Sequence, residues 1–389
     1  MPYLKIILNI QHILYYINCI FIVTRWLFIN KFSLSRIMLT FLLLILVFIF
    51  SPFKVDKTNA TFLDNKILCK ALVENVTFSN PNQNSKIKVL VSEGKYKGKE
   101  FILDNTLVVN DSELALKPND FVQISIQAGS NNKLNATIYN YPREKNILLL
   151  VAFFIALVIF IGGIKGFYAI LSIAFNICII YMLLLPGILS GYSPIKLTII
   201  CCLIISFFSL IIQNGLNKKT ISCLIGALGG VIIAGIITFI MSNSLHISIN
   251  YEEFLSLSKY SPNIKFDFQG ILFSSIVVGA LGANLDMSMS VATSMNEIKE
   301  SNPSISKPLL IESGFNIGRD MIGTMSNTLI LAYVGSSVVT LMVFLGHNVN
   351  FSYIISLQDI SVEILRALAG SMGMILSVPL TVFARAYID

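Results

Sequence analysis

Residues 279–298 read GALGANLDMSMSVATSMNEI, and after a polar turn residues 311–337 read IESGFNIGRDMIGTMSNTLILAYVGSS. Both stretches belong to long apolar segments, yet they contain acids, amides and hydroxyls where a membrane span is normally apolar. The whole chain of 389 residues is 55% hydrophobic and only 13% charged, and its mean hydropathy is +0.76. Because a soluble domain has about a quarter charged residues, this composition indicates a membrane protein that crosses the bilayer several times.

Apolar segments long enough to cross a bilayer recur along the chain. The first, residues 37–53, follows Lys31 and Arg36 and precedes no small-residue cleavage site, so we expect a retained N-terminal anchor rather than a signal peptide. Seven more spans are expected at residues 147–164, 167–189, 194–212, 221–241, 270–295, 321–346 and 365–387. The sequence therefore predicts an α-helical polytopic membrane protein with about eight transmembrane helices, the last seven within residues 146–389.

Residues 1–36 precede this anchor as an N-terminal extension. Lys5, Asn9, His12 and Arg25 interrupt its apolar stretch. Three interpretations stay open for the extension: an interfacial helix, an additional span, or sequence upstream of a later start codon.

Residues 54–145 are expected to form a small all-β domain inserted after the first helix. Short runs of β-branched and apolar residues, separated by Gly, Pro, Asn and Asp, are typical of strands joined by turns. The runs are residues 66–78, 87–92, 99–103, 121–128 and 134–139. Residues 94–98, GKYKG, are expected to close a hairpin between the second and third runs. The pattern predicts a β-barrel or sandwich, and its residues suggest no catalytic site.

The basic residues of the membrane segments gather in alternate connections. Those on one side are Lys165, Lys218, Lys219, Lys299, Lys307, Arg319 and Arg385, whereas Lys259 and Lys265 on the other side lie beside three acids. Cytoplasmic connections are enriched in Lys and Arg. The sequence therefore predicts cytoplasmic N- and C-termini and an extracytoplasmic domain at residues 54–145.

Several functional classes have no support in the sequence. Five of the six cysteines lie in apolar segments and no Cys/His spacing suggests zinc, so we expect no metal site. The net charge of +7 comes without a basic stripe interleaved with aromatic residues, so no nucleic-acid partner is expected. There is no phosphate-binding loop and no nucleophile beside a base, and therefore neither an enzyme nor a cofactor is predicted.

Polar residues of the opening stretches recur at intervals of three or four. On a helix each set shares one face: Asp286, Ser290, Thr293, Ser294 and Glu297 in the first, and Asn316, Asp320, Gly323, Thr324 and Asn327 in the second. Because a short turn joins the two helices, we expect them to lie antiparallel with their polar stripes facing each other, and Arg319 to neutralise a carboxylate. The candidate substrate- or ion-binding residues are Asn284, Asp286, Ser290, Asn316, Arg319, Asp320 and Asn327. The alternative is a salt bridge or amide network that only holds the helices together.

Pairs of glycines in the expected spans are a second feature that bears on helix packing and on a binding site. GALG occurs at residues 226–229 and again at residues 279–282, and residues 370–373 read GSMG. Small residues allow close helix packing in lipid, and they also break helices at transporter binding sites. Close packing is the commoner reason for glycines in a membrane span.

The two opening stretches resemble the YibE/F family of bacterial multi-pass membrane proteins. The order of parts, an anchor, a small β domain with its GKYKG hairpin and a block of spans, is also similar, so the resemblance extends over about residues 37–388. It implies a protein of the bacterial plasma membrane, without supplying a substrate or a reaction.

Two functions are compatible with these features. The first is a gradient-driven transporter or permease of an unknown small solute or ion, which uses the polar helix pair around Asp286 and Asp320. The alternative is a non-enzymatic membrane scaffold or sensor, whose β domain binds an external ligand or partner. The expected partners are the lipid bilayer and the solute, together with either a second copy of the chain or another membrane protein.

Overall fold

The computed structural model describes residues 66–77, 86–104, 116–128, 134–247, 265–347 and 349–388. These belong to two compact units, one within Asp56–Ile161 and the other within Gly162–Asp389 together with Met1–Val55. The N-terminal extension and the anchor expected at residues 37–53 lie outside the described residues.

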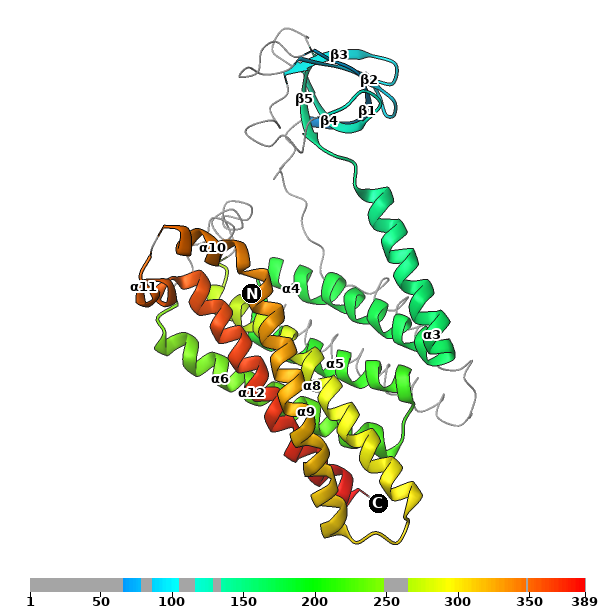
Figure 1. Ribbon diagram of the computed structural model, residues 1–389, viewed down its shortest axis with the longest axis vertical. Helices are drawn as coiled ribbons and strands as arrows, with labels where there is room; N and C mark the ends of the chain where they lie inside the picture. The colour runs from blue at the N-terminus through cyan, green and yellow to red at the C-terminus, as the bar shows by residue number, and fades with distance from the viewer. Residues whose placement is uncertain are drawn as a thin grey trace, which may run out of the picture. The chain divides into compact units, whose positions relative to one another are not determined.

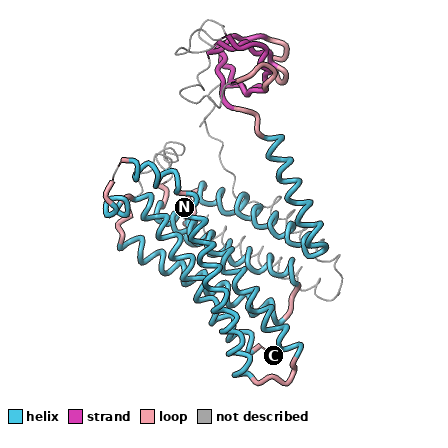
Figure 2. Tube along the Cα trace, in the orientation of Figure 1, coloured by secondary structure: helices cyan, strands magenta, loops and turns pink. Residues whose placement is uncertain are grey.

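The first unit contains a five-stranded antiparallel sheet, shown in magenta in Figure 2. Its strands are β1 (Lys66–Thr77), β2 (Lys86–Val91), β3 (Glu100–Asp104), β4 (Phe121–Ala128) and β5 (Leu134–Asn140), in the order β3-β2-β1-β4-β5. Every strand begins and ends within one residue of its predicted range. Side chains alternate between core and solvent, as in β2, where Ile87, Val89 and Val91 are buried.

The sheet curls, and its edge strands β3 and β5 approach each other (Figure 1). A bulge between Val73 and Asn75 interrupts the pairing of β1 with β2, and bulges increase local twist. The hairpin between β2 and β3 turns at Gly94 and Gly98, whose φ angles of 96° and 83° favour glycine. A small, curled antiparallel sheet is therefore the fold of these strands.

Helix α3 (Glu144–Ile179) connects the two units, and the π-helix η1 (Ile180–Leu184) and α4 (Leu185–Leu189) follow it directly. Gly163 breaks α3, with φ 55° and ψ −134°. The break falls at the end of the first of the two spans expected at residues 147–164 and 167–189. A left-handed glycine thus gives α3 two apolar arms.

The remaining helices are α5 (Pro194–Asn214), α6 (Lys218–Ser244), α8 (Phe268–Ser301), α9 (Lys307–Ser336), α10 (Val338–Gly346), α11 (Phe351–Ser356) and α12 (Gln358–Tyr387). Side chains cap two of their N-termini: Asn217 Oδ1 accepts from Thr220 N at 2.8 Å and Asp267 Oδ1 from Gly270 N at 2.9 Å. Both caps lie in the polar connections that the sequence indicates.

Five helical segments of the described residues are long and apolar enough to cross a membrane: Glu144–Leu189, α5, α6, α8 and α12. Helices α9 and α10 are apolar enough only when taken together, and the bend of 59° at Ser337 is that of a broken span or a re-entrant loop. The protein is thus a helical membrane protein. The total of about eight spans remains a prediction, because the anchor lies outside the described residues.

Helices α6, α8 and α12 pack against one another, while α9 covers α8 and α12, and α5 lies against α6 and α8 (Figure 1). Met287, Val291 and Met295 of α8 form an apolar core with Leu310 of α9 and Val378 of α12. Polar side chains are buried at the three-helix junction of α6, α8 and α12, among them Asn284, Ser288, Ser377 and Thr381.

Candidate functional site

Glycines let the backbones of α6 and α12 touch at this junction. A Cβ atom on Gly230 would lie 2.6 Å from the carbonyl oxygen of Gly373, and one on Gly373 would lie 2.6 Å from the carbonyl oxygen of Gly230. Real Cβ atoms do not approach oxygen so closely, and only glycine permits this contact. Gly373 belongs to the GSMG sequence and Gly230 directly follows the GALG sequence of residues 226–229, so glycines at these two places serve close packing.

Asn284 of α8 lies against this glycine contact. Its side chain is fully buried, and neither Oδ1 nor Nδ2 has a hydrogen-bond partner. A Cβ atom on Gly230 would lie 2.5 Å from Asn284 Oδ1 and 2.9 Å from Ser377 Cβ, so the amide faces both α6 and α12. An unpaired buried amide costs about 1–3 kcal/mol, which makes Asn284 the least satisfied polar group of the junction.

Hydroxyl groups extend the polar junction by one turn from Asn284. Ser288 is fully buried and its Oγ has no partner. A Cβ atom on Gly226 would lie 3.0 Å from Ser288 Oγ and would overlap Thr381 Oγ1. Thr381 and Ser377 donate to the backbone of their own helix, to Ser377 O at 2.8 Å and Met374 O at 2.7 Å. Their oxygens can still accept a further hydrogen bond.

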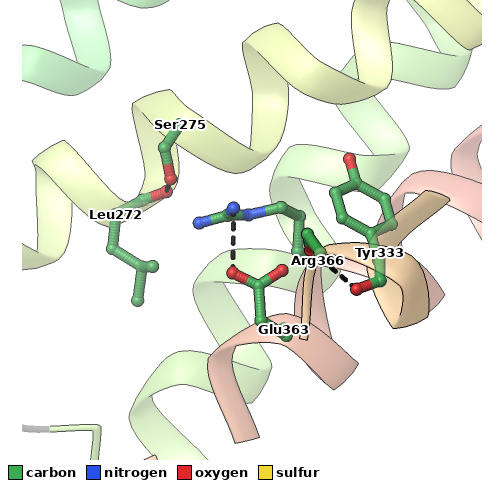
Figure 3. Close-up of polar contacts among 6 residues, drawn as sticks. Leu272, Ser275, Tyr333, Glu363 and Arg366 are labelled. Carbon is green, nitrogen blue, oxygen red and sulfur yellow. Dashed lines mark hydrogen bonds and ion pairs between the residues drawn. The ribbon is translucent and has the colours of Figure 1, made fainter. Parts of the chain in front are cut away.

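A charged pair lies nearer the first turns of α12. Arg366 Nη1 and Glu363 Oε1 are 3.1 Å apart, and their side chains are 27% and 29% exposed. Figure 3 shows the guanidinium extending toward the turn of α8 that carries Leu272 and Ser275. Tyr333 of α9 lies on the other side, with its ring centre 6.0 Å from Arg366 Cζ. Arg366 Nε and Glu363 Oε2 are buried without a partner.

A second arginine lies at the other end of α12. Arg385 is 4% exposed, and its guanidinium donates to Asn296 Oδ1 at 2.7 Å and to Ile388 O at 3.2 Å. Polar residues and glycines recur along α12 every three or four residues and so share one face, at Arg366, Gly370, Gly373, Ser377, Thr381 and Arg385. At 1.5 Å per residue, Arg366 lies about 10 Å along α12 from Gly373.

The predicted pairing of the two polar stripes is wrong. Asn316, Arg319, Asp320 and Asn327 are exposed on the side of α9 opposite its buried Leu310, Gly314 and Gly318. Arg319 Nη1 donates to Asn316 Oδ1 at 3.2 Å, within the same helix. Periodicity predicts which residues share a face but not where that face points. Glycine and apolar residues pack more closely, so they occupy the contact with α8 and α12.

The α8 residues of the predicted site separate into two groups. Asp286 is exposed and Ser290 is half-buried, whereas Asn284 is buried in the three-helix junction. Residues two apart point about 200° apart on a helix, so Asp286 and Asn284 belong to different faces. The structure therefore brings only Asn284 of the seven predicted residues into the junction.

Sequence reasoning missed Ser288, Glu363, Arg366 and Thr381. The spacing of Glu363 and Arg366, opposite charges three residues apart at the start of an expected span, was a usable signal. No sequence signal pointed to the hydroxyls of Ser288 and Thr381, because Ser and Thr occur throughout the spans.

Within the described ranges, no group of three or more His, Cys, Asp or Glu side chains is placed to hold a metal ion. The amide and hydroxyl side chains of the junction can form hydrogen bonds to a small polar group.

Comparison with known proteins identifies the helical part of the chain. The model of the YibE/F-like protein family matches residues 150–388, which include this junction, and confirms the resemblance that the sequence suggests. Searches of the curated proteins and of the solved structures found no match. The match extends over more than half of the chain, which therefore belongs to the YibE/F-like family.

Proposed function

We propose that this protein is a gradient-driven permease, in which a small polar solute or ion passes the buried side chain of Asn284. One observation carries the proposal: both polar atoms of a fully buried amide, at a glycine-lined contact of three candidate spans, have no hydrogen-bond partner. Polar groups buried in a membrane domain are costly and normally face each other or a solute path. A passing solute would satisfy the amide.

The chemistry of the junction suggests the class of solute. Asn284 supplies donors and an acceptor, and the nearby hydroxyl of Ser288 supplies both as well. Thr381 Oγ1 already donates to Ser377 O and can accept a further hydrogen bond. No charged side chain takes part in the described contacts of Asn284, whereas Arg366 and Arg385 lie nearer the two ends of α12. This composition favours a neutral polar solute or a monovalent ion over a divalent ion, which prefers carboxylates.

The proposal places the protein in the bacterial plasma membrane, with both termini in the cytoplasm. The distribution of Lys and Arg between alternate connections supports this orientation. Asp286 and Asp320 are not included in the proposed path, because both side chains are exposed.

Flux into proteoliposomes tests the proposal. The full chain is reconstituted, and uptake is followed for a panel of probes: protons, Na⁺, K⁺, glycerol, urea, alanine and glutamine. We expect flux of at least one probe above that of empty vesicles, and loss of that flux in Asn284→Leu. Ser206→Ala is the matched control, because Ser206 of α5 is also buried with an unpartnered hydroxyl. Its flux should equal that of the unsubstituted chain.

Two results would contradict the permease. One is flux no greater than in empty vesicles for every probe. The other is full flux in Asn284→Leu, which would remove this side chain from the path.

A further inference from the structure

The ion pair of Arg366 and Glu363 leaves a buried polar atom unpartnered on each side chain. The contact joins Arg366 Nη1 to Glu363 Oε1 at 3.1 Å. Arg366 Nε and Glu363 Oε2 are buried without a hydrogen-bond partner. Both residues belong to α12, which is long and apolar enough to cross a membrane. Ionisable groups in a span are costly and often mark a substrate path, so this half-satisfied pair is a candidate ligand site.

The free edge of the Arg366 guanidinium is suited to a carboxylate. A guanidinium holds its N–H groups in a rigid planar fork, in which Nε and Nη2 share one edge. Glu363 binds at Nη1, and the structure gives the other edge no partner among the described residues. Two parallel hydrogen bonds from such an edge to a carboxylate are stronger than a single contact. Arg366 can therefore hold the carboxylate of a solute while Glu363 stays in place.

Glu363 supplies the opposite half of the site. An ionised carboxylate only accepts hydrogen bonds, so its unpartnered Oε2 requires a donor. A lone anion on Arg366 would leave Oε2 unsatisfied, and a lone cation on Glu363 would leave Arg366 Nε unsatisfied. Either one would also add a net charge to the buried pair, which is costly. A solute with both a carboxylate and an ammonium group satisfies both atoms and adds no net charge.

Helices α8 and α9 fix the orientation of the guanidinium. The ring centre of Tyr333 in α9 lies 6.0 Å from Arg366 Cζ, at the outer limit of a cation–π contact. The guanidinium extends toward the turn of α8 that carries Leu272 and Ser275 (Figure 3). The hydroxyl of Ser275 already donates to Leu272 O at 2.8 Å. An ion pair and an aromatic ring thus hold the arginine, and its free edge remains for a ligand.

The pair lies on the face of α12 that leads toward Asn284. Gly370 follows Arg366 by one helical turn, and a Cβ atom on Gly370 would lie 3.7 Å from the Cβ of Ala280 in α8. Asn284 follows Ala280 by four residues, about 6 Å along α8. The ion pair and the buried amide are therefore about two helical turns apart, on surfaces that meet at Gly370.

We propose that Arg366 and Glu363 bind a zwitterionic solute of the amino-acid class, with its carboxylate on Arg366 Nε and Nη2 and its ammonium group on Glu363 Oε2. An α-amino acid bears both groups on one carbon, so they can reach two atoms of one ion pair. The inference rests on the proposed permease, because it names the class of solute that the permease takes. The pair recognises the groups that all amino acids share.

Thermal stabilisation of the purified full chain tests binding without transport. A ligand that binds the folded protein raises its melting temperature. We expect this rise with at least one standard amino acid at millimolar concentration. The corresponding amine and the corresponding deaminated acid each lack one charge, and each should bind at least about tenfold more weakly. No rise with any amino acid would overturn the proposal, and so would equal affinity for the deaminated acid.

Two substitutions separate the two halves of the site. In Glu363→Gln, which keeps the size of the side chain, the preference for the amino acid over its deaminated acid should disappear. Arg366→Lys keeps the charge but has no fork, and it should weaken binding of the amino acid by at least about tenfold. Arg319→Gln is the control, because Arg319 is exposed on α9, and it should bind as the unsubstituted chain does. A preference retained in Glu363→Gln would overturn the role of Glu363.

Binding and flux can fail separately. An amino acid that binds in this way but does not cross proteoliposomes would support the site and contradict the permease. Flux of another probe, with no binding of any amino acid, would support the permease and overturn the site.

Discussion

The backbones of Gly230 in α6 and Gly373 in α12 are in contact, with no room for a side chain on either residue. This contact fixes how closely α6 and α12 approach, and it sets the walls against which the Asn284 amide lies. Packing of the bundle and the proposed path therefore depend on the same two glycines.

Alanine at either glycine should destabilise the bundle. Gly230→Ala or Gly373→Ala forces a methyl group against a backbone carbonyl, which cannot move aside as a flexible side chain can, and overpacking of this kind costs about 1–3 kcal/mol. Gly282→Ala is the control, because no atom lies within 4 Å of its added Cβ. Thermal unfolding in detergent measures the difference. Equal melting temperatures for all three variants would show that α6 and α12 are not in backbone contact.

The pair of Arg366 and Glu363 should show measurable coupling. Its side chains are partly exposed, so solvent screens the interaction, and we expect a coupling of about 1 kcal/mol rather than that of a fully buried pair. A double-mutant cycle with Glu363→Gln, Arg366→Gln and the double variant measures it through unfolding free energies. Strictly additive effects would mean that the 3.1 Å contact contributes nothing to stability.

Lys88 should stabilise the β domain at neutral pH. Its Nζ lies 2.8 Å from Glu100 Oε2 and 2.9 Å from Glu74 Oε2, so one amine joins β1, β2 and β3. Hydrogen bonds that Lys88 donates to the carboxylates of Glu100 and then Glu74 raise the pKa of Lys88 above its usual 10.5. Because the folded-state pKa is raised, the contribution from Lys88 is present at neutral pH and is lost as the pH rises through the folded-state pKa.

Reversing the charge of Lys88 tests its contribution to the stability of the β domain. Lys88→Glu places three acids on adjacent strands, and like charges across strands are destabilising. Hydrogen–deuterium exchange at pH 7 should be faster in peptides from residues 66–104 than in the unsubstituted chain. Lys97→Glu, in the hairpin turn of the same domain, serves as a comparison with a smaller expected effect, because Lys97 is exposed. Unchanged exchange in Lys88→Glu would contradict the role of this amine.

Deletion of the β domain separates the permease from a sensor. If the solute path lies within the helices, removal of residues 60–140 should leave the flux of the reconstituted protein unchanged. A sensor or scaffold that acts through the β domain predicts complete loss of function instead. The measurement is the same proteoliposome flux, normalised to the amount of inserted protein.

The sequence predicted the secondary structure of this chain well. Local signals sufficed for it: Gly and Pro separate the strands, Asn217 and Asp267 begin two helices, and Gly163 marks the break in α3. These features depend on backbone preferences and near neighbours, which a single sequence contains.

The candidate site was harder to predict, because it depends on which face of each helix turns inward. Asn284 and Asp286 are two residues apart, and their spacing alone does not show that the amide is buried while the acid is exposed. The neighbours of Asn284 include Gly230 of α6, which is far away in sequence. Only tertiary packing brings these residues together.

Asn284→Leu tests the central claim most directly, when its stability and its flux are measured on the same preparation. Replacing an unpartnered buried amide with an apolar side chain of similar shape should leave the melting temperature unchanged or raise it, while flux is lost. This combination is expected only if the amide is kept for a passing solute. A lower melting temperature with flux retained would show that Asn284 stabilises the bundle and does not form part of a solute path.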